Sequence, residues 1–490
     1  MQFRNNLKYI RFLLIGLILF GLSLVVALKA PNNFFHAGST TVDSSVFIYM
    51  GRVILNGGMP YRDYFDHKGP VLFLINALGV YISPTWGVWL LDCFAFFVTF
   101  VMIYRIARFH CNRFFSITVV LASTYDLFRY YIEANGTEVY AMPFIAIATY
   151  IFLDYFLHEK IGTLRLMICG LSFCAVFLLR ANMIAVWMVM CIGVFLQCIM
   201  KRELVKIGYF LKWFLVGAGL LCVPIAFWLG INGAISEFID DYFIFNIIYS
   251  GSSDIVDKIT ALFYFFSIKS ILFCSVLVAI MCAVKKDLLH WLYAVLFVAS
   301  LVMMNMSGWK SDHYAMVLVP LAAYPFSFAV KCIQDGVEQN DYKSLVIAMM
   351  ICTGSVLPPW ISAIEEAVCE DFVNWNENCV LPSHQAIVDL IQQNTTKEDQ
   401  IIVIGNYNLY YNLSDRFAAS QYSYQFPIID YDLNKYGEFF DELYESVPKM
   451  VVINSHYESN EHLLEFLDSF PYRDISHVGT DGVKVFLLDS

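Results

Sequence analysis

IRFLLIGLILFGLSLVVAL, residues 10–28, is an apolar run that contains a single charged side chain, Arg11. A helix needs about 20 largely apolar residues to cross the hydrocarbon core of a bilayer, so this run predicts a membrane-spanning helix. Arg4, Lys8 and Arg11 precede its apolar centre as in a signal peptide. No small-residue cleavage site follows and further apolar runs do, so we expect an uncleaved first anchor.

Similar apolar runs recur through the next 330 residues and define the fold class. They lie at 88–108, 115–131, 141–157, 163–180, 183–200, 208–230, 262–284, 287–306, 314–332 and 344–362. The chain of 490 residues is 59% hydrophobic and 15% charged, with a mean hydropathy of +0.61. Soluble proteins are about 45–50% apolar and about 25% charged. This composition excludes a soluble enzyme, a disordered chain, a nucleic-acid binder and a disulfide-rich secreted module, and predicts a polytopic α-helical membrane protein with about eleven transmembrane helices.

The distribution of Lys and Arg between loops predicts the orientation of these helices. Cytoplasmic loops are rich in Lys and Arg. If the N-terminus is cytoplasmic, every cytoplasmic loop carries at least two such residues, for example Arg105 and Arg108 in one loop or Lys201 and Arg202 in another. An odd number of helices then places the C-terminal region outside the cytoplasm.

Residues 364–490 differ in character from residues 1–363. They hold 22 of the 42 acidic residues, although the whole chain has a formal net charge of only −11. Strand-like runs at 401–404, 450–453 and 483–488 alternate with helix-like runs at 384–393, 439–446 and 461–470. This alternation is typical of an α/β fold. We therefore predict a transmembrane domain at 1–363 and a small extracytoplasmic α/β domain at 364–490.

Two of the 13 cysteines, Cys369 and Cys379, lie in this external region. Most of the others fall in apolar runs, where Cys is a small apolar filler. In an oxidising compartment Cys369 and Cys379 could form a disulfide. The sequence is equally compatible with two unpaired thiols at the surface.

The first outer connection, residues 29–87, is far longer than a turn needs to be, and long ordered loops in compact proteins are often functional. Asp43 precedes an amphipathic stretch at 44–55, and either Thr41 or Asp43 can cap the helix expected there. The residues Arg62, Asp63, Asp66, His67 and Lys68 follow within a short turn. Ionisable side chains this close to a bilayer are costly unless they face a cavity or a ligand, so the connection predicts a ligand site. The apolar run at 71–82 is too short to span and predicts an interfacial helix.

The order of residues in this connection resembles a known family. Asp43, Gly57-Gly58, Pro60-Tyr61, Asp63, Asp66 and Lys68-Gly69-Pro70 are similar to the first external loop of bacterial membrane glycosyltransferases with the GT-C fold, in the protein O-mannosyltransferase-like and lipid A aminoarabinose transferase-like families. Later outer elements are also similar, namely Glu133 to Glu138, Arg180-Ala181-Asn182, Phe245-Asn246 with Tyr249, and Gly308 through His313 to Pro320. The resemblance covers most of the chain and implies a GT-C-like fold.

The resemblance implies transfer of a sugar from a polyprenyl phosphate or diphosphate to an acceptor at the outer face of the membrane. Asp43 would act as general base, and direct displacement would invert the anomeric carbon. Lys68, with Arg180 and His313 as further candidates, would hold the lipid phosphate. The remaining candidates, for binding sugar or acceptor, are Asp63, Asp66, His67 and Glu138.

The resemblance implies no certain cofactor. Some relatives carry paired acids at the first site and bind a divalent metal, whereas Ser44 and Ser45 follow Asp43 here. A metal is therefore weakly supported and no metal ligand is assigned. Relatives also have Lys-Pro-Pro where this chain has Lys68-Gly69-Pro70, a change that can shift the helix start without removing the cation.

The expected partners are a polyprenyl-phosphate-linked sugar donor, an envelope glycan, lipid or protein acceptor, and membrane lipids, with no nucleic acid. The expected location is the plasma (inner) membrane of a bacterium. A transporter or flippase of a polyprenyl-linked glycan and a non-catalytic scaffold are the alternatives. Transporters place ionisable groups near the bilayer midplane and often have repeated halves, whereas here these groups are concentrated in outer loops.

Four charged residues outside these motifs carry separate predictions. Asp240 and Asp241 are expected to be solvated loop acids. Asp92 lies inside the run at 88–108 and faces either a catalytic cavity or the membrane interface. Lys269 interrupts the run at 262–284, and we take it to mark the start of that span.

Overall fold

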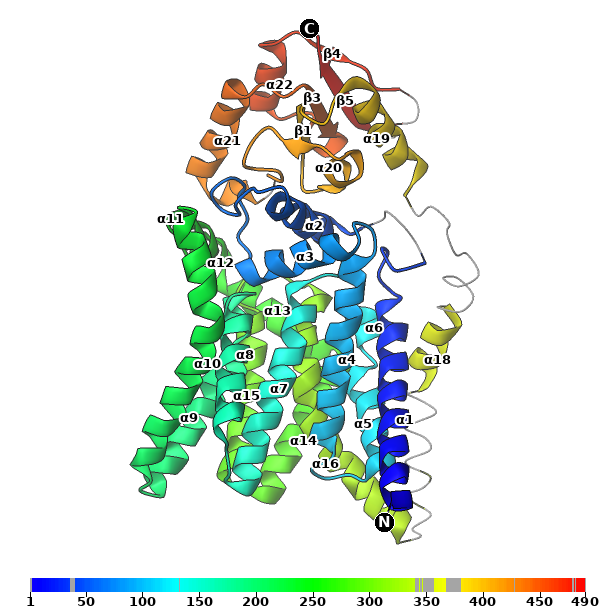
Figure 1. Ribbon diagram of the computed structural model, residues 1–490, viewed down its shortest axis with the longest axis vertical. Helices are drawn as coiled ribbons and strands as arrows, with labels where there is room; N and C mark the ends of the chain where they lie inside the picture. Colours follow the sequence, from blue (N-terminus) through cyan, green and yellow to red (C-terminus); the bar gives the residue numbers. More distant parts are fainter. Residues whose placement is uncertain are drawn as a thin grey trace. The chain divides into compact units, whose positions relative to one another are not determined.

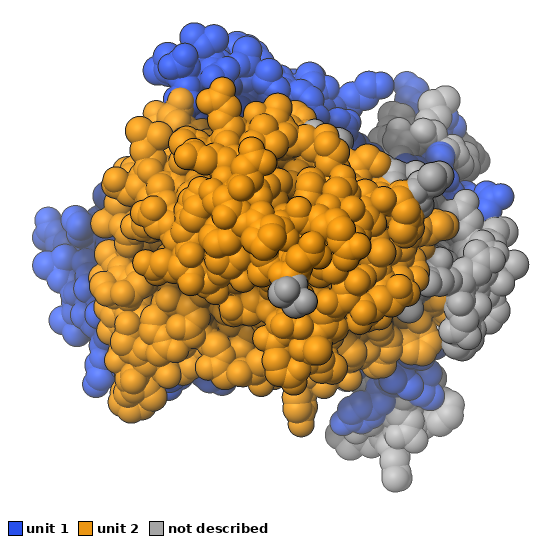
Figure 2. All heavy atoms as spheres, turned by 90° about the horizontal axis from the view of Figure 1, so that it is seen from above, with its two compact units in different colours: residues 1–30, 91–226, 253–373 blue, residues 31–90, 227–252, 374–490 orange. Residues whose placement is uncertain are grey.

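The structure is a computed structural model that describes residues 2–35, 40–131, 133–339, 343, 346, 357–366, 380–426, 428–477, 480 and 482–489. The chain divides into two compact units, drawn in different colours in Figure 2. Unit 1 comprises residues 1–30, 91–226 and 253–373. Unit 2 comprises residues 31–90, 227–252 and 374–490.

The regular elements described in unit 1 are all helices, and most of them run side by side (Figure 1). The helices lying wholly or mostly in unit 1 are α1 (Gln2–Ala27), α4 (Gly87–Ala107), α5 (Arg113–Thr124), α6 (Leu127–Tyr130), α7 (Thr137–His158), α8 (Thr163–Phe177), η1 (Ala181–Met183), α9 (Ala185–Met200), α10 (Leu204–Ile231), α13 (Ile255–Ser267), α14 (Lys269–Lys285), α15 (Leu288–Met304), η3 (Asp312–Leu318), α16 (Val319–Glu338) and α18 (Leu357–Glu366).

Five of the described helices are long and apolar enough to cross a membrane: α1, α4, α7, α10, and η3 continued by α16. The pair α13 and α14 makes a sixth if it is counted as one broken span. The helices α8, α9 and α15 are apolar but shorter. The predicted polytopic α-helical fold is confirmed, while the number of eleven spans stays a prediction. Most of the run at 344–362 lies outside the described residues.

Two expected spans are broken in the structure. The run at 262–284 is not one helix, because α13 ends at Ser267 and α14 begins at Lys269 with a bend of 85°. A lysine is costly in the middle of a span and is better placed at a helix start. Lys269 is the first residue of α14, while its place at the start of a span stays a prediction. The run at 115–131 is likewise split, since α5 ends at Thr124 and the short α6 follows.

Small residues let some helices of unit 1 approach closely. A Cβ atom on Gly170 of α8 would collide with the backbone of Phe214 in α10, and one on Gly217 of α10 would collide with that of Met167 in α8. Such glycines allow the helix backbones to come into direct contact. Close contact strengthens van der Waals packing between helices in a membrane, where the hydrophobic effect does not drive their association.

Unit 2 contains a five-stranded mixed sheet in the order β2-β1-β3-β5-β4. Strands β2, β1 and β3 are parallel, and β5 is antiparallel to β3 and β4. The bounds are β1 (Gln400–Ile404), β2 (Phe417–Ala418), β3 (Met450–Asn454), β4 (Tyr472–Asp474) and β5 (Val483–Leu488), with helices α19 (Pro382–Asn394), α20 (Leu409–Ser414), η6 (Ile429–Tyr431), α21 (Leu433–Glu445), η7 (Ser455–Tyr457) and α22 (Glu461–Asp468). The predicted C-terminal α/β fold is confirmed.

The first outer connection folds onto this sheet and belongs to unit 2. It forms α2 (Val42–Leu55) and α3 (Pro70–Ile82), and residues 227–252 add α11 (Ile235–Phe238), the π-helix η2 (Ile239–Ile244) and α12 (Phe245–Gly251). The backbone N–H of Ala418 in β2 donates to the Tyr49 hydroxyl of α2 at 2.9 Å. The Arg52 guanidinium donates to the Tyr411 carbonyl at 2.7 Å and pairs with Asp415 at 2.8 Å. The connection is thus anchored to the C-terminal sheet by α2.

The helices α2 and α3 cross at a glycine. An ideal Cβ on Gly51 would lie 2.7 Å from the backbone carbonyl carbon of Asn76, closer than atoms can pack. Only glycine therefore fits at this crossing, which fixes α3 and the turn that precedes it relative to α2.

Candidate functional site

Lys68 lies in a tight turn immediately before α3. Its backbone N–H donates to Asp66 Oδ1 at 2.9 Å, and its Nζ lies 2.5 Å from Nε2 of His67. Gly69 is the N-cap of α3 and Pro70 its first residue. Helix N-termini attract anions. The turn therefore places a cation next to a helix end that favours negative charge.

His67 lies between the Lys68 side chain and Tyr424. An ammonium group can only donate, so the tautomer of His67 with its proton on Nδ1 allows Nε2 to accept from Lys68. Nδ1 lies 3.2 Å from the hydroxyl oxygen of Tyr424. The backbone carbonyl of His67 accepts a 2.7 Å hydrogen bond from the Asn246 side chain in α12. Two segments that are distant in sequence thus contact the turn, and one of them is the predicted motif 245–249.

Asp66 is fully buried beside this turn. Burial raises its pKa to about 6, opposed chiefly by the nearby Lys68 ammonium, while Asp43 raises it further. Within the described residues, Asp66 Oδ2 has no hydrogen-bond partner. Burial therefore favours the protonated form of Asp66, while its other oxygen, Oδ1, accepts from the Lys68 backbone N–H.

The raised pKa of Asp66 predicts a pH-dependent effect of Asp66→Asn on stability. A carboxyl whose pKa rises from 3.8 to about 6 on folding stabilises the protonated folded state, so the wild type loses stability as pH rises through this window. At about 1.4 kcal/mol per unit, the loss above pH 6 is about 3 kcal/mol. Asn carries no charge and can keep the hydrogen bond to the Lys68 backbone N–H. Asp66→Asn should therefore unfold at a higher temperature than wild type at pH 8, where the Asp66 carboxyl is charged, and at a similar temperature at pH 4.

Asp63→Asn is the matched control for this thermal unfolding series. The Arg62 guanidinium lowers the pKa of Asp63, so the loss of this charge should destabilise the protein at pH 8. A lower unfolding temperature for Asp66→Asn at pH 8 would contradict the account.

Asp43 lies in the first turn of α2, where Thr41 occupies the N-cap position. The suggestion that Asp43 caps this helix is therefore wrong. Asp43 is half-buried, and in the described part of the chain its carboxylate has no hydrogen-bond or ion-pair partner. Its charge raises the pKa values of both Asp66 and Tyr424. Asp43 and the Lys68 turn are thus electrostatic neighbours within unit 2.

Asp63 has a different environment from Asp66. Its Oδ1 accepts from Arg62 Nε at 2.6 Å, and its Oδ2 accepts from the Met59 backbone N–H at 2.7 Å. Both oxygens are therefore engaged in holding the turn at 59–64.

Unit 2 also contains a buried ion pair, between Lys435 and Asp241, that the sequence does not indicate. Lys435 of α21 lies 2.7 Å from Asp241 and 3.0 Å from Asp240, with its Nζ 4.9 Å from the centroid of the Phe65 ring. The prediction of a solvated acid is wrong for Asp241, which is 4% exposed, whereas the Asp240 side chain is 52% exposed. Burial raises the pKa of Asp241 to about 7. Two adjacent acids in the sequence indicate that a cation lies nearby. Lys435 is too far from them in the sequence to be identified as that cation.

In unit 1 the structure brings together Glu138, Arg180 and His313. Glu138 in the first turn of α7 is 3% exposed and pairs with Arg180 at 2.5 Å. The Arg180 guanidinium carbon lies 4.5 Å from the centroid of the Tyr314 ring, and His313 is close enough to act on the Glu138 charge. We call Glu138, Arg180, His313 and Tyr314 the Arg180 cluster.

Asp92 of α4 fixes the loop that leads to the Arg180 cluster. Its Oδ2 accepts from the Tyr131 hydroxyl at 2.5 Å and from the Asn135 backbone N–H at 2.9 Å. Ala134 and Asn135 have φ of 45° and 47°, a left-handed conformation that side chains disfavour. Asp92 is therefore a positioning residue for the segment that ends at Glu138.

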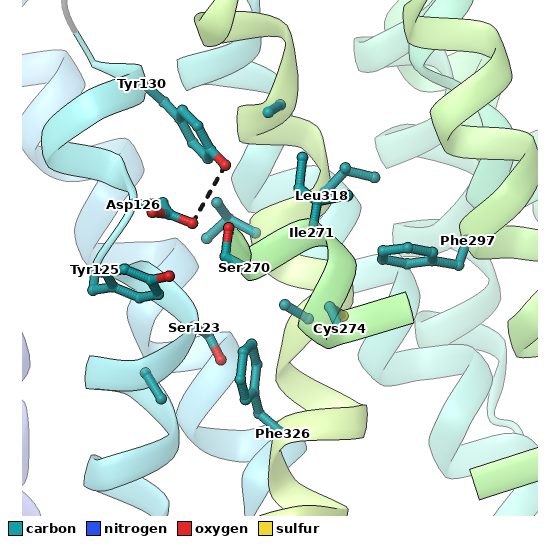
Figure 3. Close-up of a pocket in the computed structure, with 14 residues that line it drawn as sticks. Ser123, Tyr125, Asp126, Tyr130, Ser270, Ile271, Cys274, Phe297, Leu318 and Phe326 are labelled. Carbon is teal, nitrogen blue, oxygen red and sulfur yellow. Dashed lines mark hydrogen bonds between the residues drawn. The ribbon is translucent and has the colours of Figure 1, made fainter. Parts of the chain in front are cut away.

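A cavity of about 30 Å³ lies in unit 1 beside the α13–α14 break (Figure 3). Asp126, Tyr130 and Ser270 line it, and the Tyr130 hydroxyl donates to Asp126 at 3.3 Å. Among described residues, the hydroxyls of Ser123 and Ser270 lack partners. The cavity is large enough for a water molecule.

No group of three or more His, Cys, Asp or Glu residues within the described ranges is placed to hold a metal ion. Cys369 and Cys379 lie outside the described residues, so the disulfide stays a prediction.

The fold is that of GT-C membrane glycosyltransferases. ArnT from Cupriavidus metallidurans bound to undecaprenyl phosphate matches with a TM-score of 0.62 and 11% identity over 98% of this chain and 97% of that chain. Apo ArnT from this organism gives 0.60 and 11%, over 96% and 97%. The archaeal oligosaccharyltransferase AglB from Archaeoglobus fulgidus, in complex with an inhibitory peptide and a dolichol-phosphate, gives 0.53 and 13%, over 99% of this chain and 75% of that chain.

By sequence, the chain belongs to the family described as "Putative competence-induced protein Ccs4 N-terminal domain", which matches residues 4–356. The matched region includes Asp43, Lys68 and the Arg180 cluster. No curated protein sequence matches the chain.

Proposed function

We propose that this protein transfers a sugar from a polyprenyl-phosphate donor to an acceptor at the outer face of a bacterial plasma membrane. The observation that carries the proposal is that Asp43 and the Lys68 turn belong to one unit, where the Asp43 charge acts on Asp66, in a chain with the GT-C fold. ArnT, whose structure contains bound undecaprenyl phosphate, shares that fold over 98% of this chain.

The proposed reaction is a direct displacement. The acceptor hydroxyl or amine attacks the anomeric carbon of the sugar while its proton passes to the Asp43 carboxylate. The bond between the anomeric carbon and the phosphate oxygen breaks, polyprenyl phosphate leaves with the bonding electrons, and the anomeric configuration inverts. An Asp43 carboxylate without a partner among described residues is suited to accept this proton.

Lys68 is assigned to the lipid phosphate. Its ammonium group and the N-terminus of α3 would both stabilise the negative charge on the leaving oxygen. We assign His67 and Asp66 as positioning residues, because they contact the side chain and the backbone of Lys68. We assign Asp63 to the turn rather than to the sugar, since both of its oxygens are engaged.

The Arg180 cluster is assigned to the phosphate or to the sugar hydroxyls. Glu138 holds the guanidinium on one side and Tyr314 packs against its face, so the orientation of this planar cation is fixed, and a guanidinium suits phosphate oxygens. His313 is a further candidate for the same anion. The acceptor, whether glycan, lipid or protein, would meet the external α/β domain at 364–490.

The test is deletion of the gene and restoration with the wild-type chain, followed by mass spectrometry of surface glycans and polyprenyl-linked sugars. The proposal expects one sugar to disappear from a surface polymer while its polyprenyl-linked form accumulates, and both changes to be reversed on restoration. Accumulation of a complete lipid-linked glycan confined to the inner leaflet would indicate a transporter instead. If the deletion changes neither the surface glycans nor the lipid-linked sugars, the proposal is overturned and the result favours a scaffold role.

A further inference from the structure

A cavity of about 560 Å³ lies at one end of the helices of unit 1, where the α7–α8 and α9–α10 connections meet. Its wall is apolar and includes the buried side chains of Tyr155, Val194 and Phe210. Its rim carries the cations Lys160, Arg165 and Lys206. This volume is within the range of small-ligand sites, about 300–1,000 Å³. The cavity therefore combines an apolar interior with a positively charged rim.

Most charges around this rim are already paired. Three ion pairs surround the cavity: Arg165 with Asp154, Lys206 with Glu203 and Lys201 with Glu159. Lys160 is exposed, and among described residues it has no carboxylate partner. Among the described residues that line the cavity, Lys160 is therefore the cation that no carboxylate balances.

The surroundings of the cavity are unusually apolar for a surface. Leu164, Met200 and Val205, in the same helix ends, are 68%, 73% and 89% exposed. In a membrane protein such side chains face acyl chains, while Lys and Arg at helix ends reach to the headgroups. The opening is therefore placed for a lipid to enter from the membrane interface.

We propose that this cavity binds one anionic glycerophospholipid of the surrounding membrane. Its phosphodiester carries one negative charge, which matches the unbalanced charge of Lys160. The N-terminus of α8, whose N-cap Gly162 lines the cavity, adds to the attraction for the phosphate. The beginning of an acyl chain fills the apolar space beside Tyr155 and Phe210. Basic pockets between membrane helices bind anionic headgroups in this way.

The test uses the purified full-length protein in detergent micelles, with retained lipid measured by native mass spectrometry. Phosphatidylglycerol is the anionic probe and phosphatidylcholine the neutral one. Wild type should retain phosphatidylglycerol at several times the occupancy of phosphatidylcholine. Lys160→Gln should lower phosphatidylglycerol occupancy at least threefold. Lys286→Gln, at an exposed lysine after α14 and outside the cavity, should leave it unchanged.

Equal retention of the two lipids by wild type, or equal phosphatidylglycerol retention by the two variants, would overturn the proposal. Undecaprenyl phosphate is the third probe, because it is also an anionic lipid. If it displaces phosphatidylglycerol from wild type but not from Lys160→Gln, the cavity belongs to the donor lipid and the proposal is wrong. Equal unfolding temperatures of the variants and wild type would exclude misfolding as the cause of weaker lipid retention. Lys160→Glu provides a second test, because it reverses the charge at this position.

Discussion

Asp43→Asn is expected to reduce sugar transfer by a factor of about 10²–10⁴, the usual contribution of a general base. Asn has the same shape as Asp but cannot take the acceptor proton. The Asp43 side chain has no hydrogen-bond or ion-pair partner among described residues, so the substitution should not disturb the fold. The measurement is the rate at which the missing sugar returns to the surface polymer when the variant is expressed in the deletion strain.

Asp63→Asn is the matched control, because Asp63 belongs to the same outer connection but is engaged by Arg62 and Met59. At equal expression it should transfer sugar within about a factor of three of wild type. If Asp43→Asn restores the glycan at the wild-type rate, Asp43 is not the base. A similar loss in both variants would indicate that any change in this connection disturbs the fold.

Arg180→Met is expected to have the largest effect on stability. Glu138 is 3% exposed and its carboxylate pairs with Arg180 at 2.5 Å. Removing one partner of a buried ion pair leaves an uncompensated charge, which costs about 3–5 kcal/mol. The unfolding temperature of the purified protein should therefore fall by several degrees.

The double variant Glu138→Gln/Arg180→Met separates this structural cost from a binding role. Once the buried charge is gone, most of the lost stability should return, while sugar transfer should stay low because the guanidinium is absent. If Arg180→Met unfolds at the wild-type temperature, the ion pair is not a stabilising contact. Recovery of both stability and transfer in the double variant would limit Arg180 to a structural role.

The regular elements could be predicted from the sequence because their signals are local. The expected strands at 401–404, 450–453 and 483–488 match β1, β3 and β5 to within one residue. The edge strands β2 and β4 are two and three residues long, too short to produce a pattern. The breaks at Thr124 and Ser267 were hidden inside continuous apolar runs, and only the charge of Lys269 signalled the second.

The candidate site could be predicted only in part. The clustering of Asp43, Asp66 and Lys68 in one loop was visible in the sequence, as were the three separate motifs that form the Arg180 cluster. The partners that hold them were not. Tyr424 lies 357 residues after His67 and Lys435 lies 194 residues after Asp241, and no local pattern links positions so far apart. Burial, which distinguishes Asp66 from Asp63, likewise depends on long-range packing.

Binding of undecaprenyl phosphate to the purified protein tests the central claim most directly, because it needs no knowledge of the sugar or acceptor. Wild type should bind it saturably. Lys68→Gln should bind about 10–100-fold more weakly, the effect of losing a charged hydrogen bond worth about 1.5–3 kcal/mol. Lys310→Gln, at an exposed lysine elsewhere in the chain, should bind as wild type does. No binding by wild type, or equal binding by wild type and Lys68→Gln, would contradict the assignment of Lys68 to the lipid phosphate.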